Sequence, residues 1–89
     1  MLQALPMEQA MNPEAVTLLA ECLGSLGRFD DAASRVMDAA DRQPTNGALR
    51  FEAALWLHRA GRTDEAIEWA TQASGLGESR AQEWLDSLP

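Results

Sequence analysis

The stretch Gly27–Ala32, which reads Gly-Arg-Phe-Asp-Asp-Ala, returns 34 positions later at Gly61–Ala66 as Gly-Arg-Thr-Asp-Glu-Ala. Four of the six positions are identical, and a fifth exchanges one carboxylate for another. A fixed period of this length is the signature of a stacked helical repeat, and two copies in phase argue against a helix boundary found twice by accident. The same offset also pairs Ala20 with Ala54, Leu23 with Leu57 and Ala39 with Ala73.

Each copy of the stretch predicts a helix, a tight turn and an antiparallel helix. Gly27 and Gly61 can adopt the left-handed conformation that ends a helix. The carboxylates that follow suit the first turn of the next helix, where free N–H groups and the positive end of the helix dipole lie. We expect Thr63 to cap the helix of the second copy. Ala32 and Ala66 allow two helices to approach closely, because they have almost no side chain.

Composition excludes several classes of partner. The chain has 89 residues, seven basic residues that are all arginine, and a net charge of −7. That charge argues against nucleic acid and against an anionic membrane surface. The single cysteine, Cys22, cannot form an internal disulfide, which fits a reducing compartment. We therefore expect a cytoplasmic protein, although a signal sequence that has been removed is compatible with these residues.

The order of polar and apolar residues predicts an all-α chain with helices throughout and no strand. Val16, Leu19, Ala20, Leu23 and Leu26 recur at helical spacing and form one apolar face of the first helix. Leu18 and Cys22 widen this face, so we expect the first helix to be covered on more than one side. Further expectations are Thr45 or Asn46 as the cap of the third helix, an ion pair between Asp38 and Arg42, and Ile67 facing inward.

The chain divides into a leading segment and one domain. Residues 1–11 are an N-terminal segment or partial helix that we expect to cover the first helix, or the remainder of a preceding unit. The domain over 12–89 comprises repeat 1 at about 13–46, repeat 2 at about 47–80 and a capping helix at about 78–88.

These features resemble the tetratricopeptide repeat (TPR) family over about residues 13–88. Departures are Val16 and Arg50 where the family places tryptophan, and Thr63 where it places an aromatic residue. The resemblance implies antiparallel helix pairs stacked as a short right-handed α-solenoid. The residues that match the family's repeat signature are Ala20, Leu23, Gly27, Ala32, Ala39, Pro44, Ala54, Leu57, Gly61, Ala66 and Ala73.

The resemblance also implies that the first helix of each pair lines a concave groove that binds a peptide or a partner helix. By analogy, the groove residues are Glu14, Thr17, Glu21, Phe51, Leu55 and His58. One branch of the family holds a C-terminal carboxylate with lysine and asparagine, and this chain has no lysine. A groove that mixes carboxylates with Phe51 and Leu55 suits an apolar segment with basic flanks.

Catalysis is a less favoured interpretation of the same residues. Cys22 and His58 are the only soft nucleophile and the only imidazole, and a dyad needs them within hydrogen-bond reach. The repeat alignment places Cys22 on the core side of its helix, away from His58. One histidine and one cysteine do not make a tetrahedral metal site. We therefore predict no enzyme activity, no metal site and no cofactor.

Two classes of function remain. The first is a protein-protein interaction module for a peptide or a partner protein, as part of a larger bacterial scaffold or assembly protein or as a small adaptor. The second is self-association as a homodimer, since two repeats and a cap lie near the lower limit for an independently stable array. Of the three tryptophans, Trp56 and Trp84 are expected in the core. For Trp69 the sequence leaves both alternatives open, a place in the core or a place on a contact surface.

Overall fold

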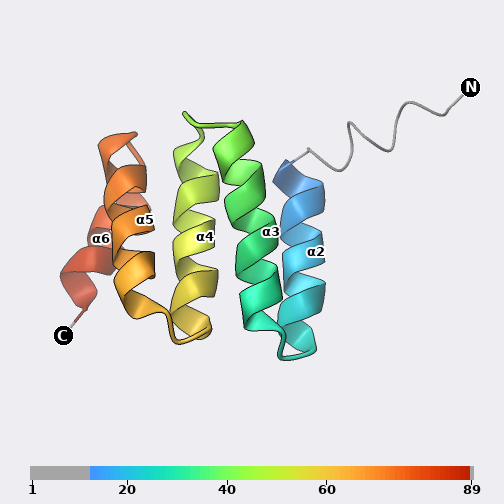
Figure 1. Ribbon diagram of the computed structural model, residues 1–89. Helices are drawn as coiled ribbons and strands as arrows, with labels where there is room; N and C mark the ends of the chain where they lie inside the picture. The colour runs from blue at the N-terminus through green and yellow to red at the C-terminus, as the bar shows by residue number, and fades with distance from the viewer. Residues whose placement is uncertain (1–12, 89) are drawn as a thin grey trace, which may run out of the picture.

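The computed structural model describes residues 13–88, and every regular element in that range is an α-helix (Figure 1). The prediction of an all-α fold is confirmed. The predictions for residues 1–11 and Asn12 lie outside the described residues. The helices are α2 (Pro13–Ser25), α3 (Phe29–Arg42), α4 (Gly47–Arg59), α5 (Thr63–Gly75) and α6 (Ser79–Ser87).

Neighbouring helices in the chain are neighbours in space. Helices α2, α3, α4 and α5 stand side by side with alternating direction, and α6 packs on α5 at the far end of the row (Figure 1). Helix pairs α2–α3 and α4–α5 are the two copies of the repeat. The chain therefore forms a short helical-repeat solenoid, in which each pair buries its apolar face against the next.

The turns within each helix pair have the backbone that the glycines predict. Gly27 and Gly61 have φ angles of +78° and +84°. In the first turn, the Arg28 N–H donates to the Leu23 carbonyl at 2.9 Å, and the second turn repeats this bond from Arg62 to Leu57. These bonds satisfy carbonyls that the helix end leaves free. The turn glycine is thus required by a left-handed conformation at the same place in both repeats.

The start of α4 follows its prediction, and the start of α5 does not. Asn46 caps α4, because its Oδ1 accepts a hydrogen bond from the Leu49 N–H at 3.1 Å. Thr63 was expected to cap α5, but α5 begins at Thr63 itself. Arg62 occupies the cap position and makes no side-chain cap bond there. Arg62 is the one residue between the left-handed Gly61 and α5, so Thr63 lies one position too far along to cap.

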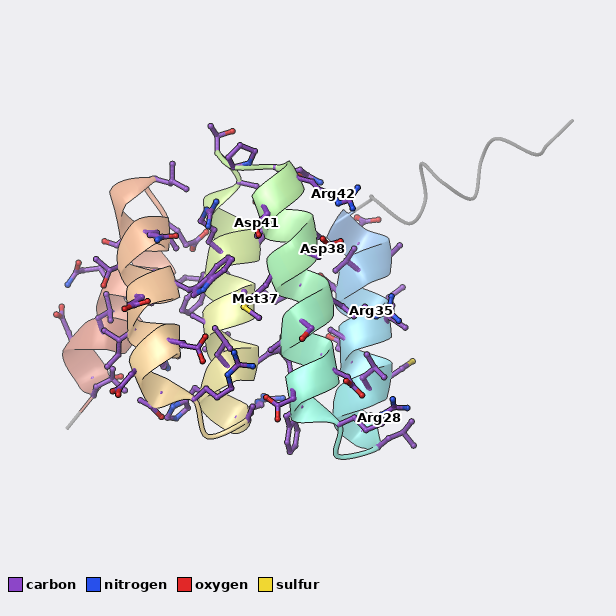
Figure 2. The ribbon with its side chains drawn as sticks, in the orientation of Figure 1. Arg28, Arg35, Met37, Asp38, Asp41 and Arg42 are labelled. Atoms are coloured by element: carbon purple, nitrogen blue, oxygen red, sulfur yellow. The ribbon has the colours of Figure 1, made fainter. Side chains whose placement is uncertain are left out.

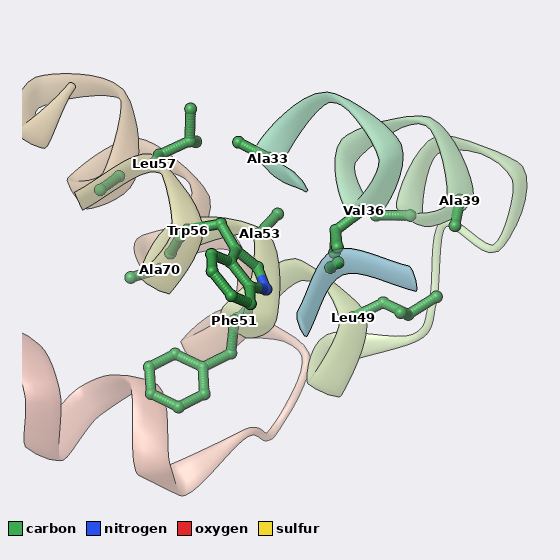
Figure 3. Close-up of a cluster of buried hydrophobic side chains, with 14 of the residues drawn as sticks. Ala33, Val36, Ala39, Leu49, Phe51, Ala53, Trp56, Leu57 and Ala70 are labelled. Atoms are coloured by element: carbon green, nitrogen blue, oxygen red, sulfur yellow. The ribbon is translucent and has the colours of Figure 1, made fainter. Parts of the chain in front are cut away.

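Alanine dominates the core of the described residues. Ala33, Ala39, Ala53 and Ala70 are buried beside Val36, Leu49 and Leu57 in Figure 3. Because these side chains are small, the helix backbones approach closely and a few large side chains fill the remaining space. The repeat-signature alanines that are fully or almost fully buried are Ala20, Ala32, Ala39, Ala54, Ala66 and Ala73.

The first helix is covered on fewer sides than its sequence suggests. Leu26, Leu18 and Leu19 are 71%, 63% and 43% exposed, and Cys22 is exposed as well. The expectation that these residues are covered is wrong for the described part of the chain. Helix α2 stands at the end of the row, so its described neighbours cover only the side that carries Val16 and Ala20. Ile67 on α5, which was expected to face inward, is 37% exposed.

Arg62 joins the two repeats. Its guanidinium forms a two-bond contact with Glu65, with N–O distances of 2.6 and 2.9 Å. The same guanidinium donates to Asp30 of the first repeat at 3.1 Å. Arg28 pairs with Asp31 three residues later, at 2.7 Å, in the equivalent place. The repeated Gly-Arg stretch therefore encodes an arginine that pairs with a carboxylate of the helix it precedes. The predicted Asp38–Arg42 ion pair is also present, at 3.3 Å.

Acid is expected to destabilise the fold through these pairs. The hydrogen bond from Arg62 holds the pKa of Glu65 below its ordinary value of 4.5, and the bond from Arg80 does the same to the pKa of Glu78. A carboxylate with a lowered folded-state pKa stabilises the fold above its ordinary pKa, and this contribution is lost as the pH falls through the lowered value. We expect the urea concentration at the unfolding midpoint to decrease as the pH drops below about 4.5. In the double variant Glu65→Gln/Glu78→Gln we expect this decrease to be smaller. An equal fall in both proteins would contradict these pKa directions.

Candidate binding groove

A groove of about 650 Å³ opens between α2, α4 and the start of α6. Thr17, Glu21 and Gly24 line it from α2, and Leu55 and Trp56 line it from α4. Helices α2 and α4 both pack on α3 and make few contacts with each other, which leaves the groove open between them. Side chains of α2 and α4 form its walls.

A second hollow of about 460 Å³ adjoins the groove near the beginnings of α2 and α4. The two hollows share Thr17, Glu21, Ala48 and Glu52. Thr17 Oγ1 donates a hydrogen bond to Glu52 Oε1 at 2.9 Å and so links α2 to α4 at the boundary between them. The larger groove and the smaller hollow therefore form one continuous surface across the repeats.

An aromatic pair forms one end of the groove. The rings of Phe29 and Trp56 are 6.3 Å apart between centroids and close to parallel, at 27°. The Trp56 ring lies over Gly24, where a β-carbon would overlap it. Arg59 completes this end with its guanidinium carbon 4.9 Å from the Trp56 ring centroid, in cation–π geometry.

Helix α6 closes the opposite end of the groove. Trp84 packs edge-on against Phe51 at 6.5 Å and against His58 at 5.5 Å between ring centroids. The Arg80 guanidinium carbon lies 5.3 Å from the Phe51 ring centroid, and Arg80 also pairs with Glu78 at 2.6 Å. These contacts explain why Phe51 is only 7% exposed.

Carboxylates line both parts of this surface, whereas arginines border only the larger groove. The smaller hollow is lined by the carboxylates Glu14, Glu21 and Glu52 and by no arginine. Arg59 and Arg80 border the larger groove. Within residues 13–88, Arg59 forms no ion pair and stacks only on Trp56. The acidic part suits a basic side chain, and Arg59 suits a carboxylate.

The six groove residues predicted from the sequence lie in three different places. Thr17, Glu21, Phe51 and Leu55 line the larger groove, and Glu14 lines the smaller hollow together with Thr17 and Glu21. His58 lines neither hollow; it is exposed and contacts Trp84, and its Nδ1 lies 3.3 Å from Thr63 Oγ1.

Several groove residues were missed by sequence reasoning. They are Phe29, Glu52, Trp56, Arg59 and Arg80. A signal for the three on α4 was present, because positions 52, 56 and 59 lie on one side of a helix together with Leu55. Phe29 and Arg80 had no comparable signal, since they reach the groove from the start of other helices.

The remaining candidates from the sequence lie away from the groove. Cys22 was placed on the core side of its helix, but it is exposed on α2. Trp69 is half-buried on α5, and the Arg50 guanidinium carbon lies 5.0 Å from its ring centroid. Arg50 also donates a hydrogen bond to Gln72 Oε1. Among residues 13–88, no group of three or more histidine, cysteine or acidic side chains is arranged to hold a metal ion.

A comparison with protein-family models matches residues 17–81 to the tetratricopeptide repeat, which covers most of the chain. The chain therefore belongs to the tetratricopeptide repeat family. Members of this family are generally modules for protein–protein interaction and are typically not catalytic. No curated protein and no solved structure matches the chain. No helix within residues 13–88 combines the length and the apolar character that a membrane span requires.

Proposed function

We propose that this protein is a non-enzymatic interaction module that binds a segment of another protein along the surface formed by the groove and the adjoining hollow. The observation that carries the proposal is the combination of a 650 Å³ groove with an aromatic wall and an acidic hollow beside it. Such a concave, mostly apolar surface with a few polar groups is the usual form of a binding site. Family membership supports the class of function.

The charges favour a segment of a particular chemistry. We infer an apolar or aromatic residue against Leu55 and Trp56, and a lysine or arginine over Glu14, Glu21 and Glu52. A carboxylate on the segment would pair with Arg59, which has no ion pair among the described residues. The net charge of −7 favours the approach of a basic segment from solution.

A random peptide library displayed against the full chain tests this proposal. We expect selected peptides to combine an apolar residue with at least one basic residue. Leu55→Glu and Glu52→Arg are each expected to weaken binding of a selected peptide by about tenfold or more, as loss of a contact near the centre of an interface does. Fluorescence anisotropy with the labelled peptide measures the affinity.

Matched variants outside the groove are the control. Ile67→Glu repeats the change at Leu55 on α5, and Glu68→Arg repeats the change at Glu52 on an exposed part of α5. Both controls are expected to keep the affinity of the unmodified chain. Selection of uniformly acidic peptides, or equal losses in the groove and control variants, would count against the proposal. Phe51→Ala is a poor test, because Phe51 is buried against Trp84.

A further inference from the structure

The groove side chains of α4 change from acidic to apolar to basic along the helix. Glu52 and Arg59 are seven residues apart, and Leu55 and Trp56 lie between them. Residues seven apart lie on the same side of a helix. Because a helix rises about 1.5 Å per residue, the backbone positions of Glu52 and Arg59 are about 10 Å apart. A partner that follows α4 therefore meets a carboxylate, an apolar surface and a guanidinium in that order.

Arg59 is the basic group that is available to a partner. Arg80 also borders the groove, but it is paired with Glu78 at 2.6 Å. Arg59 forms no ion pair within residues 13–88. At the acidic end Glu21 of α2 joins Glu52, since both line the groove and the hollow. The two ends of the surface thus favour opposite charges on the partner.

The groove offers few hydrogen-bond partners to the backbone of an extended segment. Its walls are helices, in which most backbone N–H and C=O groups bond within the helix. The hydroxyl groups of Thr17 and Ser25 already donate, to Glu52 Oε1 and to the Glu21 carbonyl. An extended segment would lose water from its peptide groups without replacement, whereas a helix satisfies these groups internally. The groove therefore favours a helix as its occupant.

We propose that the occupant is an amphipathic helix that runs antiparallel to α4. On one side it carries an acidic residue, an apolar residue four positions later and a basic residue seven positions later, which is how a helix occupies a groove. These residues meet Arg59, Leu55 and the pair Glu21 and Glu52, respectively. The inference rests on the proposed function and adds the conformation, the spacing and the direction of the segment.

The helix dipoles favour the antiparallel direction. Arg59 lies in the last turn of α4, and the acidic hollow lies near the beginnings of α2 and α4. An antiparallel partner has its N-terminal end beside Arg59 and its C-terminal end over the hollow. A carboxylate is stabilised at the N-terminal end of a helix and a basic side chain at the C-terminal end. The partner's own dipole therefore agrees with the charges it meets only in this direction.

Designed peptides of about 16 residues test the spacing and the direction. In the first, glutamate, leucine and lysine stand at i, i+4 and i+7 among alanine and glutamine residues. The second has the reversed sequence, and the third moves lysine to i+9, on the opposite side of the helix. Fluorescence anisotropy with the full chain is expected to show that the first peptide binds about tenfold more tightly than the others. Equal affinities, or tighter binding of the reversed peptide, would overturn the inference.

A charge exchange tests the contact at Arg59. Arg59→Glu is expected to weaken binding of the first peptide by about tenfold, and lysine in place of the peptide's glutamate is expected to restore it. Arg35→Glu is the matched control, because Arg35 is an exposed arginine of α3 that lines neither hollow (Figure 2). Both substitutions change the net charge equally, so long-range attraction weakens equally in both. An equal loss in the two variants, or no restoration, would overturn the contact.

The bound conformation separates this inference from the proposed function. Transferred nuclear Overhauser effects are expected to show a helix in a peptide selected from the library. An extended bound peptide whose affinity Leu55→Glu still lowers would overturn the inference and leave the groove proposal standing. A selected peptide that neither Leu55→Glu nor Glu52→Arg weakens would count against the groove itself, and the inference would fall with it.

Discussion

Trp56→Ala is expected to lower the free energy of unfolding by about 3–5 kcal/mol, the cost of truncating a large buried aromatic residue. Trp56 is 6% exposed, stacks on Phe29 and supports Arg59. It is one of the few large side chains between helices that otherwise meet through alanine. Urea unfolding followed by circular dichroism measures the change. A loss below about 1 kcal/mol would show that Trp56 does not hold the repeats together.

Gly24→Ala provides a second measurement of the same contact. A β-carbon at Gly24 overlaps the Trp56 ring, so the substitution is expected to cost about 1–3 kcal/mol in the unmodified chain. In the Trp56→Ala background the overlap is absent, and the higher helix propensity of alanine is expected to stabilise the protein by up to about 1 kcal/mol. The effect of one substitution therefore changes sign. A cost that is the same in both backgrounds would mean that Gly24 is needed for another reason.

Leu57→Ala is the other change with a large expected effect, about 2–5 kcal/mol. Leu57 is fully buried, and it is one of the two largest fully buried side chains among the described residues. Its removal leaves a cavity between helices that cannot close further, because alanines already hold them at short range. Leu55→Ala is the matched control on the same helix, since Leu55 is only half-buried at the groove.

The same urea experiment measures both leucine variants. Leu55→Ala is expected to cost less than Leu57→Ala, because Leu55 is only partly buried whereas Leu57 is fully buried. Equal losses in the two variants would contradict the assignment of Leu57 to the core and Leu55 to the groove wall.

The sequence predicted the features of the fold that depend on local sterics. Gly27 and Gly61 were recognised because a left-handed turn needs glycine, and Ala32 and Ala66 because close helices need small side chains. Exposure could not be predicted in the same way. Cys22 occupies the position in repeat 1 that Trp56 occupies in repeat 2, yet Cys22 is exposed and Trp56 is buried. The difference arises because α4 lies between α3 and α5, whereas α2 lies at the end of the row of described helices.

The candidate groove was predictable only in part. The resemblance named residues on the first helix of each repeat, and four of them line the larger groove. Arg80 was beyond that reasoning, because its position depends on how α6 lies beside Phe51 of α4. His58 shows the same limit: the repeat pattern placed it in the groove, while contact with Trp84 on α6 holds it outside both hollows.

An NMR titration tests the central claim most directly. The isotope-labelled full chain is titrated with a peptide selected from the library, and the shifted amide and indole signals are mapped on the structure. The account predicts the largest changes at Thr17, Glu21, Leu55 and the Trp56 indole, with little change on the outer faces of α3 and α5. Changes concentrated on α3 and α5, with the Trp56 indole unmoved, would contradict it.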